Sequence, residues 1–255
     1  MLNLQQDLIQ NTIIHQGYTL PDVMLIQTST TSTNDDLLQL CQQQPHIQSA
    51  LVCSESQTQG RGQHQRQWCS PQGNIYFSSL VQLQRPLDGK LALEVALNII
   101  HCPSLQDYPL QIKWANDLYS PQGKWGGILI EPVDQHRVIV GIGINLQPLS
   151  EQQRSQITQA CTSLSELNIT IQANPFIAEL YIAMQNAAQW FNYGSQNLKQ
   201  RFNHVAYQLN EMIEFEYQQQ ILKGRFLGIH DDGALILHHQ HGEQYFYNGR
   251  MLIQQ

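Results

Sequence analysis

Two segments of this chain combine glycines with positive charge, and their residue types suit an anionic ligand. The first, Ser54 to Trp68, reads S-E-S-Q-T-Q-G-R-G-Q-H-Q-R-Q-W, and the second, Lys113 to Glu131, reads K-W-A-N-D-L-Y-S-P-Q-G-K-W-G-G-I-L-I-E. The chain has only 13 lysines and arginines in 255 residues, and these segments hold four of them: Arg61, Arg66, Lys113 and Lys124. Backbone N–H groups beside glycine can approach phosphate oxygens, and arginine or lysine supplies the countercharge. A basic turn would explain the first segment alone, but the two segments together favour a binding site.

The surrounding sequence predicts the elements that position these residues. Residues rich in β-formers lead into and out of the first segment, at Ala50 to Cys53 and at Asn74 to Leu83. A nearly continuous apolar run at Leu91 to Ile100 favours a buried helix, and helical spacing follows Pro175. We expect further strands at Val23 to Thr28, Gln111 to Trp114, Gly127 to Glu131 and Arg137 to Ile142.

The last part of the chain has a different pattern. After about Tyr207 it contains five short β segments, separated by turns such as D-D-G at Asp231 and H-G at His241. Short strands in close succession favour a small barrel of the SH3 type. We therefore expect two domains, at residues 1–206 and 207–255.

Two further motifs complete a resemblance. T-S-T-N at Thr31 to Asn34 precedes acidic and apolar residues, so helix capping alone would explain it, and V-G-I-G-I-N spans Val140 to Asn145. With these four pieces in order, the chain resembles the catalytic core of biotin–protein ligases, whose loop reads roughly G-R-G-R-x-G-R-x-W and whose second signature reads K-W-P-N-D. The resemblance runs from about Thr28 to the C-terminus. It implies an α+β fold of the class II synthetase type, in which a mixed or antiparallel sheet flanked by helices forms the catalytic domain, followed by an SH3-like barrel.

The resemblance implies a two-step reaction. Biotin attacks the α-phosphate of ATP to give biotinoyl-5′-AMP and pyrophosphate, and a lysine amine of a biotin carboxyl carrier protein then attacks the mixed anhydride. Two anions must therefore be brought together, charge on the phosphoryl oxygens must be stabilised, and the anhydride must be kept from water. Biotin and ATP would be substrates, with Mg²⁺ as a cofactor.

The family pattern, carried over residue by residue, implies four catalytic side chains: Lys124, Lys113, Arg61 and Asp117. One ammonium group at Lys124 would bridge the biotin carboxylate and the phosphoryl oxygen, although a solvated turn lysine is the alternative. Lys113 would stabilise charge on the α-phosphate. Asp117 could bind Mg²⁺, contribute with Asn116 to nucleotide recognition, or receive the attacking lysine, and the sequence leaves these roles open.

The same resemblance implies two sets of binding residues. The biotin site would comprise Ser32, Thr33, Asn34, Gln57, Arg61, Gly62, Gln63, Lys124, Gly126 and Gly127. The ATP and adenylate site would comprise Arg61, Arg66, Trp68, Lys113, Asn116 and Asn145. The residues alone also allow purely structural roles in place of these binding roles. The two glycines of G-G-I-L-I-E could form a β-bulge or allow close strand packing. Trp68 could belong to the hydrophobic core, and Asn145 could cap the end of a strand.

The chain departs from the family loop at two positions. Gln63 replaces the usual arginine, and Gln65 replaces the usual glycine. Loss of a guanidinium from a loop that closes over the adenylate predicts weaker retention of biotinoyl-AMP.

Composition excludes several other classes of protein. The net charge of −7 and the pI near 5.7 disfavour the basic face that nucleic-acid binding needs. Five scattered cysteines without C-x-x-C spacing predict neither a zinc site nor a disulfide framework, and three histidines at His238, His239 and His241 are typical of a solvated turn. With no leader pattern and no apolar run of bilayer length, we expect a cytoplasmic protein without membrane association.

Competing functions follow from the same residues. A lipoate or octanoate ligase or transferase has a related fold but would need an apolar tunnel rather than a polar S-T-N motif. A non-catalytic biotin-binding regulator is disfavoured by the two lysines and Asp117. Only thirty residues precede T-S-T-N, so we expect a short form without a DNA-binding domain. The expected partner is the biotin carrier of acetyl-CoA carboxylase, and the sequence leaves open whether the chain forms a homodimer.

Overall fold

The computed structural model describes residues 2–63 and 66–252, and its larger part is a seven-stranded mixed sheet. The strand order is β1-β2-β3-β7-β6-β5-β4. The pair β1 and β2 is parallel and the other neighbours are antiparallel. Its strands are β1 (Val23–Gln27), β2 (Ala50–Ser54), β3 (Ile75–Gln82), β4 (Gln111–Lys113), β5 (Asp117–Ser120), β6 (Gly123–Pro132) and β7 (Arg137–Ile144).

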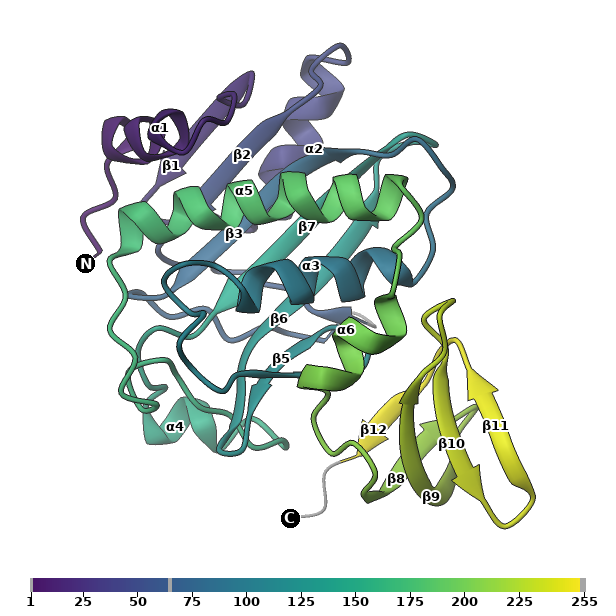
Figure 1. Ribbon diagram of the computed structural model, residues 1–255. Coiled ribbons are helices and arrows are strands. Elements are labelled where there is room, and N and C mark those ends of the chain that lie inside the picture. Colours follow the sequence, from purple (N-terminus) through teal and green to yellow (C-terminus); the bar gives the residue numbers. More distant parts are fainter. Residues whose placement is uncertain (1, 64–65, 253–255) are drawn as a thin grey trace.

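Helices cover both faces of this sheet. The helices are α1 (Gln6–His15), α2 (Thr33–Gln43), α3 (Lys90–Ile100), α4 (Glu151–Arg154), α5 (Ala173–Asn192) and α6 (Leu198–Val205). Helices α3 and α5 lie side by side across one face (Figure 1), with α1 packed against α5. Helix α2 packs on β2, β3 and β7.

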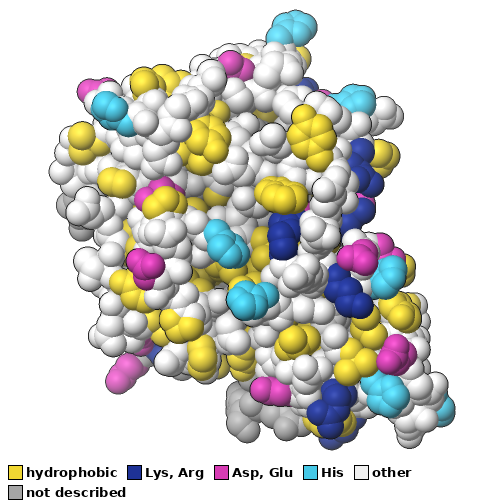
Figure 2. Space-filling view, viewed as in Figure 1, with side chains coloured by type: hydrophobic (Ala, Val, Ile, Leu, Met, Phe, Trp, Pro, Cys, Tyr) yellow, Lys and Arg dark blue, Asp and Glu magenta, His cyan; other side chains and the backbone are white. Residues whose placement is uncertain are grey.

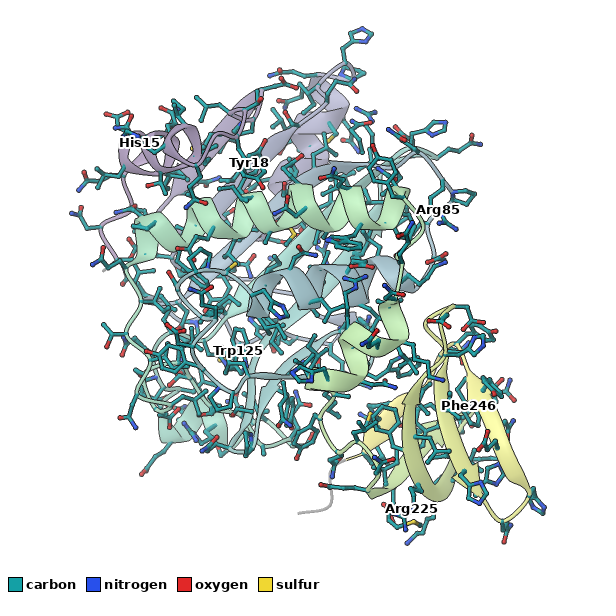
Figure 3. All side chains as sticks on the ribbon, in the orientation of Figure 1. His15, Tyr18, Arg85, Trp125, Arg225 and Phe246 are labelled. Carbon is teal, nitrogen blue, oxygen red and sulfur yellow. The ribbon has the colours of Figure 1, made fainter. Side chains whose placement is uncertain are left out.

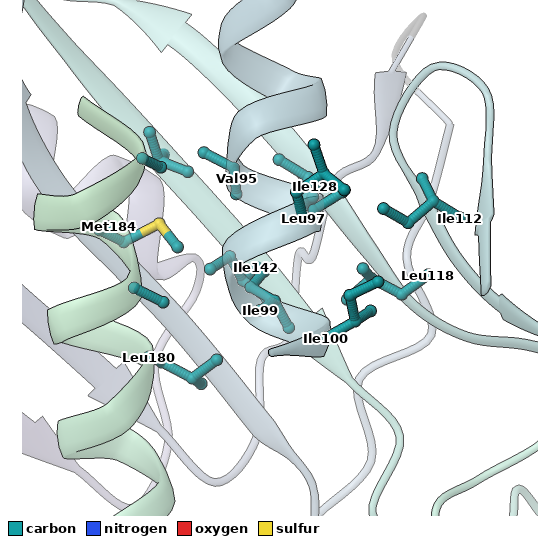
Figure 4. Close-up of a cluster of buried hydrophobic side chains, with 14 of the residues drawn as sticks. Val95, Leu97, Ile99, Ile100, Ile112, Leu118, Ile128, Ile142, Leu180 and Met184 are labelled. Carbon is teal, nitrogen blue, oxygen red and sulfur yellow. The ribbon is translucent and has the colours of Figure 1, made fainter. Parts of the chain in front are cut away.

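The alternation of side chains along the strands produces two separate apolar layers. In β2, Leu51 and Cys53 belong to the large core beneath α3 and α5, whereas Ala50 and Val52 join a smaller cluster with α2. Figure 4 shows the larger core, where α5 and α3 project aliphatic side chains toward Ile142 of β7. The cluster at α2 leaves part of its face of the sheet free of apolar packing, and the polar motifs occupy that part.

A five-stranded antiparallel sheet follows α6 in the order β11-β10-β9-β8-β12. Its strands are β8 (Met212–Tyr217), β9 (Gln220–Ile229), β10 (Leu235–His239), β11 (Gly242–Phe246) and β12 (Arg250–Leu252). It lies beside α6 and the β4–β5 end of the large sheet (Figure 1). The Trp114 indole donates a hydrogen bond to the Gly233 carbonyl at 3.0 Å, which ties the K-W-A-N-D segment to this sheet.

The expected α+β class and the C-terminal run of short strands are confirmed, but three details differ. Asp117 begins β5, a strand that the sequence did not predict. Lys124 lies within β6 opposite Tyr119 rather than at a turn. Helix α6 was also not predicted, because its few apolar residues form too short a periodic pattern.

The surface matches the composition. On the face that carries α3 and α5, charged side chains are scattered among uncharged polar ones (Figure 2), as expected when only 13% of residues are charged. No helix in residues 2–63 and 66–252 is both long and apolar enough to cross a bilayer.

Candidate active site

The register of the large sheet places two glycines next to a carboxylate and an ammonium group, and this row of residues forms the floor of a cavity. Tyr76, Gly143, Gly127, Asp117 and Lys113 are successive cross-strand partners on β3, β7, β6, β5 and β4. Because partners in register project toward the same face, the two glycines lower the floor next to the carboxylate and the ammonium group. Three segments distant in sequence are thus brought into one row.

A cavity of about 560 Å³ lies over this floor. It is lined by most of the residues that the sequence predicted: Ser32, Thr33, Asn34, Gln57, Arg61, Gly62, Gln63, Arg66, Trp68, Lys113, Asn116, Asp117, Lys124 and Gly127. Two predicted residues do not line it. A Cβ at Gly126 would lie 2.9 Å from the Gly143 carbonyl, so close strand packing explains that glycine, and Asn145 lines a neighbouring cavity.

Lys113 and Lys124 share one carboxylate in this cavity. Asp117 Oδ1 lies 2.5 Å from Lys124 Nζ, and Oδ2 lies 3.9 Å from Lys113 Nζ. Lys113 is only 3% exposed, and burial lowers its pKa to about 8. Asp117 opposes this shift in pKa, whereas the positive charges of Lys124, Arg250 and Arg66 add to it. Two ammonium groups balanced by one carboxylate form a site with capacity for further negative charge.

The T-S-T-N motif forms a buried polar cluster on the α2 side of the cavity. Ser32 is the N-cap residue of α2, yet its side chain makes no capping hydrogen bond, so capping does not account for its hydroxyl group. The Thr33 backbone N–H donates to Gln57 Oε1 at 2.9 Å. Ser78 Oγ lies 2.7 Å from Thr33 Oγ1 and 2.6 Å from Asn34 Oδ1. The motif is therefore held by β3 and the loop and presents hydroxyl and amide groups to the cavity.

The glycine–arginine loop connects this cluster to the charged end of the cavity. Arg61 donates to Asp35 at 2.5 Å and lies 3.3 Å from Glu131. Gln63 and Arg66 line the cavity from the same loop. Gln65 lies outside the described residues, so its predicted effect has no structural account.

Trp68 lies above the glycine floor. A Cβ at Gly143 would come within 2.5 Å of the indole Nε1, and one at Gly127 within 3.1 Å of the ring. Lys124 Nζ lies 5.0 Å from the ring centroid, a cation–π distance. The indole N–H is buried without a hydrogen-bond partner in the described structure. Trp68 thus packs against the site itself rather than in a separate core.

A second cavity of about 350 Å³ adjoins the first across Trp68 and Lys124. Asn145 lines it, and Asn145 Nδ2 donates to the Thr162 carbonyl at 3.1 Å. The remaining lining is largely uncharged and includes Gln153, Gln156 and Gln159. The two cavities therefore join a charged region to a neutral one on either side of Lys124.

Sequence reasoning missed Tyr247, Ser78 and Glu131, and it did not distinguish between the two arginines of the C-terminal domain, Arg225 and Arg250. Tyr247 and Arg250 of the C-terminal sheet line the larger cavity, whereas Arg225 bonds the Asn210 carbonyl at the far end of that sheet (Figure 3). Ser78 and Glu131 hold Asn34 from β3 and β6. Strand alternation could have indicated Glu131, since it lies four residues after Gly127 and faces the same side.

His238, His239 and His241 lie at the β10–β11 hairpin. His239 Nε2 pairs with Gln244 Oε1 at 3.1 Å. Within the described residues no group of three or more histidine, cysteine or acidic side chains is arranged to hold a metal ion.

Comparison with known families places both parts of the chain. Residues 25–145 match the biotin/lipoate A/B protein ligase family, and residues 209–253 match the biotin protein ligase C-terminal domain. A biotin–[acetyl-CoA-carboxylase] ligase of Paracoccus denitrificans is 31% identical, over 84% of this chain and 94% of its own length. The bifunctional ligase/repressor BirA of Escherichia coli is 28% identical over 75% of this chain. That match spans only 62% of the BirA length, less than two thirds.

Solved structures agree on the fold. Biotin protein ligase from Aquifex aeolicus, in complex with biotin and ATP, superposes with a TM-score of 0.75 at 21% identity, covering 91% of this chain and 98% of that one. Biotin protein ligase from Leishmania major, in complex with biotinyl-5-AMP, superposes with a TM-score of 0.58 at 19% identity, covering 92% and 100%.

Proposed function

Because the chain belongs to the biotin–protein ligase family, we propose that it activates biotin with ATP and transfers the biotinoyl group to a lysine of a carrier protein. The observation that carries this proposal is the meeting of Lys113, Lys124 and Asp117 in one cavity with the T-S-T-N cluster. A carboxylic acid bound at the polar cluster would direct its carboxylate toward the two ammonium groups.

In the first step, Lys124 brings two anions together. Its ammonium group lies between the two cavities, so it can contact the biotin carboxylate and the α-phosphate at once. The carboxylate oxygen attacks the α-phosphorus, the bond to the bridging oxygen breaks, and pyrophosphate leaves. Lys113, supported by Arg66 and Arg250, stabilises the charge on the phosphoryl oxygens.

The adenosine would occupy the second cavity. Thr162 fixes the Asn145 amide through its Nδ2 group, which leaves the Oδ1 oxygen as an acceptor for an amino group. Trp68 separates this cavity from the glycine floor and would cover the anhydride. Exclusion of water by this side chain protects the mixed anhydride from hydrolysis.

Asp117 is the proposed protein ligand of Mg²⁺. It is the only acidic residue among the described residues that line the larger cavity. A single carboxylate fits the way Mg²⁺ usually binds in nucleotide sites, where phosphates and water supply the other ligands. When bound, the ion would neutralise phosphate charge. Since both carboxylate oxygens of Asp117 face lysines in the free protein, the nucleotide phosphates would have to replace the carboxylate at Lys124.

In the second step, the neutral carrier amine attacks the carbonyl carbon, the bond to the phosphate oxygen breaks and AMP leaves. Asp117 would accept the proton that the amine loses, because its carboxylate lies in the same cavity. The proposed carrier is the biotin-bearing domain of acetyl-CoA carboxylase, the substrate named for the Paracoccus relative. The proposal also includes three properties of the protein. It would act in the cytoplasm, it would not bind DNA, and it would function as a monomer or a homodimer.

A lipoate or octanoate ligase is the second candidate, because the matched family includes lipoate ligases. The buried hydroxyl and amide groups of Ser32, Thr33 and Asn34 favour a polar ring over an alkyl chain.

Pyrophosphate exchange tests the proposed function. Wild-type protein should incorporate labelled pyrophosphate into ATP only when biotin is present, and it should label a carrier domain with biotin rather than lipoate. Exchange that is independent of biotin, or labelling with lipoate alone, would contradict the proposal.

A further inference from the structure

Glu131 contacts two of the motifs that build the cavity, although it does not line the cavity itself. Its Oε2 accepts a hydrogen bond from Asn34 Nδ2 at 2.6 Å, and its Oε1 lies 3.3 Å from Arg61 Nη2. Asn34 is 5% exposed, whereas the side chains of Glu131 and Arg61 are 38% and 37% exposed. Glu131 therefore connects a buried recognition group to an exposed loop.

The contact with Glu131 determines what Asn34 presents to a ligand. A carboxylate only accepts hydrogen bonds, so it selects the amide nitrogen of Asn34, and Ser78 Oγ then lies 2.6 Å from the amide oxygen. Gly141 faces the same amide, and a Cβ there would overlap it. The Asn34 amide is thus held in one orientation from three sides.

The contact with Arg61 is shared with a second acid. Asp35, 40% exposed, accepts from Arg61 Nη1 at 2.5 Å. Ion pairs this exposed contribute little to folding, so their position between a binding motif and a loop needs a different explanation. Asp35 contacts the loop only, whereas Glu131 contacts both the loop and Asn34.

We propose that Glu131 is a positioning residue that holds the Asn34 amide for recognition of biotin and links that amide to the Arg61 guanidinium. This inference rests on the proposed ligase function. Glu131 touches no substrate, but it holds the Asn34 amide and the Arg61 guanidinium in one arrangement. Because one carboxylate contacts both groups, loss of Glu131 would release the Asn34 amide and the Arg61 guanidinium together, and a ligand held by both would be bound more weakly.

The proposal is tested with Glu131→Gln, Glu131→Ala, Asp35→Asn and the control Glu214→Gln, whose carboxylate pairs with Lys223 at 2.7 Å on the small sheet. Biotin KM and kcat are measured by pyrophosphate exchange, and the release of preformed biotinoyl-AMP is measured by chase. Both Glu131 variants should raise the biotin KM about 10-fold and speed adenylate release to a similar extent, with kcat at saturating biotin within about threefold of wild type. Asp35→Asn should speed release while the biotin KM stays within about twofold, and Glu214→Gln should match wild type.

Several results would overturn the inference. The first is a wild-type biotin KM and a wild-type rate of adenylate release in both Glu131 variants. The second is a Glu131→Ala variant whose KM and release rate match those of Asp35→Asn. The third is a loss of kcat at unchanged biotin KM together with a lower Tm. The last pattern would indicate a purely structural role. If wild-type protein shows no biotin-dependent exchange, the proposed function fails and this inference fails with it; normal wild-type exchange with unaffected variants rejects the inference alone.

Discussion

The Asp117 carboxylate holds the Lys124 ammonium at 2.5 Å across the paired strands β5 and β6. Both side chains are largely buried, at 14% and 12% exposure, so the contact is only weakly screened by water. The ion pair orients the Lys124 side chain before a ligand arrives. In the proposed reaction, an incoming phosphate would replace the carboxylate at this ammonium group, which would link nucleotide binding to a rearrangement within the cavity.

The first prediction concerns the pH dependence of adenylation. Burial lowers the Lys113 pKa to about 8, so the ammonium form is lost from the free enzyme as the pH rises through this value. We expect kcat/KM for ATP to fall above about pH 8, because this parameter reports groups of the free enzyme. Lys113→Arg, whose guanidinium stays charged, should give a flat profile over the same range. A wild-type profile that is level from pH 7 to 9.5 would contradict the assignment.

The second prediction concerns stability. The folded-state pKa of Lys113 is lowered, so between about pH 8 and 10.5 the unfolded chain binds more protons than the folded chain, and stability rises with pH in this window. Below about pH 8 the buried charge destabilises the fold. Lys113→Met should therefore increase the free energy of unfolding at pH 7 by about 1–3 kcal/mol while abolishing adenylation. Urea unfolding at pH 7 and pH 10 checks this, and the gain should be smaller at the higher pH.

The third prediction concerns retention of the adenylate. Gln63 lines the larger cavity at a position where related loops carry arginine. A guanidinium there would add a charge-assisted contact to the phosphate, so Gln63→Arg should slow release of biotinoyl-AMP by about 10-fold. The off-rate of preformed adenylate measures this, with Gln59→Arg as a control, because Gln59 is exposed and lines neither cavity. Equal off-rates for wild type and Gln63→Arg would reject the idea.

The fourth prediction separates two glycines of the sheet. Alanine at Gly126 would place its Cβ 2.9 Å from the Gly143 carbonyl, a backbone atom that cannot move away, so Gly126→Ala should lower Tm by several degrees. Alanine at Gly143 would instead meet the Trp68 indole, which belongs to a loop. Gly143→Ala should fold with nearly wild-type Tm but bind biotin and ATP at least 10-fold more weakly. Calorimetry and ligand titration of both variants test the contrast, and the reverse pattern would refute it.

The fifth prediction compares two arginines of the C-terminal sheet. Arg250 lines the larger cavity and its charge acts on Lys113, whereas Arg225 bonds the Asn210 carbonyl away from the cavity. Arg250→Ala should raise the KM for ATP by about 5- to 30-fold, in line with the loss of one charge-assisted contact. Arg225→Ala should leave this KM within about twofold. Equal effects of the two substitutions would exclude a direct role of the C-terminal sheet.

Local signals in the sequence were sufficient for much of the architecture. The strands β1, β2, β3, β4, β6 and β7 and the helix α3 follow runs of apolar or β-forming residues that need no tertiary information. Strand β5 was missed because Asp117 and the preceding asparagine are typical of turns, and cross-strand pairing overrides that preference. Lys124 was expected at a turn for the same reason, since the glycine before it marks the β5–β6 connection.

The sequence by itself determined which residue types are available for chemistry: the glycine–arginine loop, the two lysines with Asp117, and the S-T-N cluster. Only the tertiary structure decided how they combine. Sheet register places Gly143, Gly127 and Asp117 in one row, and close strand packing removes Gly126 from it. The contributions of Glu131 and Arg250 were also decided at this level, because each depends on contacts between segments far apart in the chain. Local periodicity records which face a residue occupies, but it carries no information about which distant residue will lie opposite.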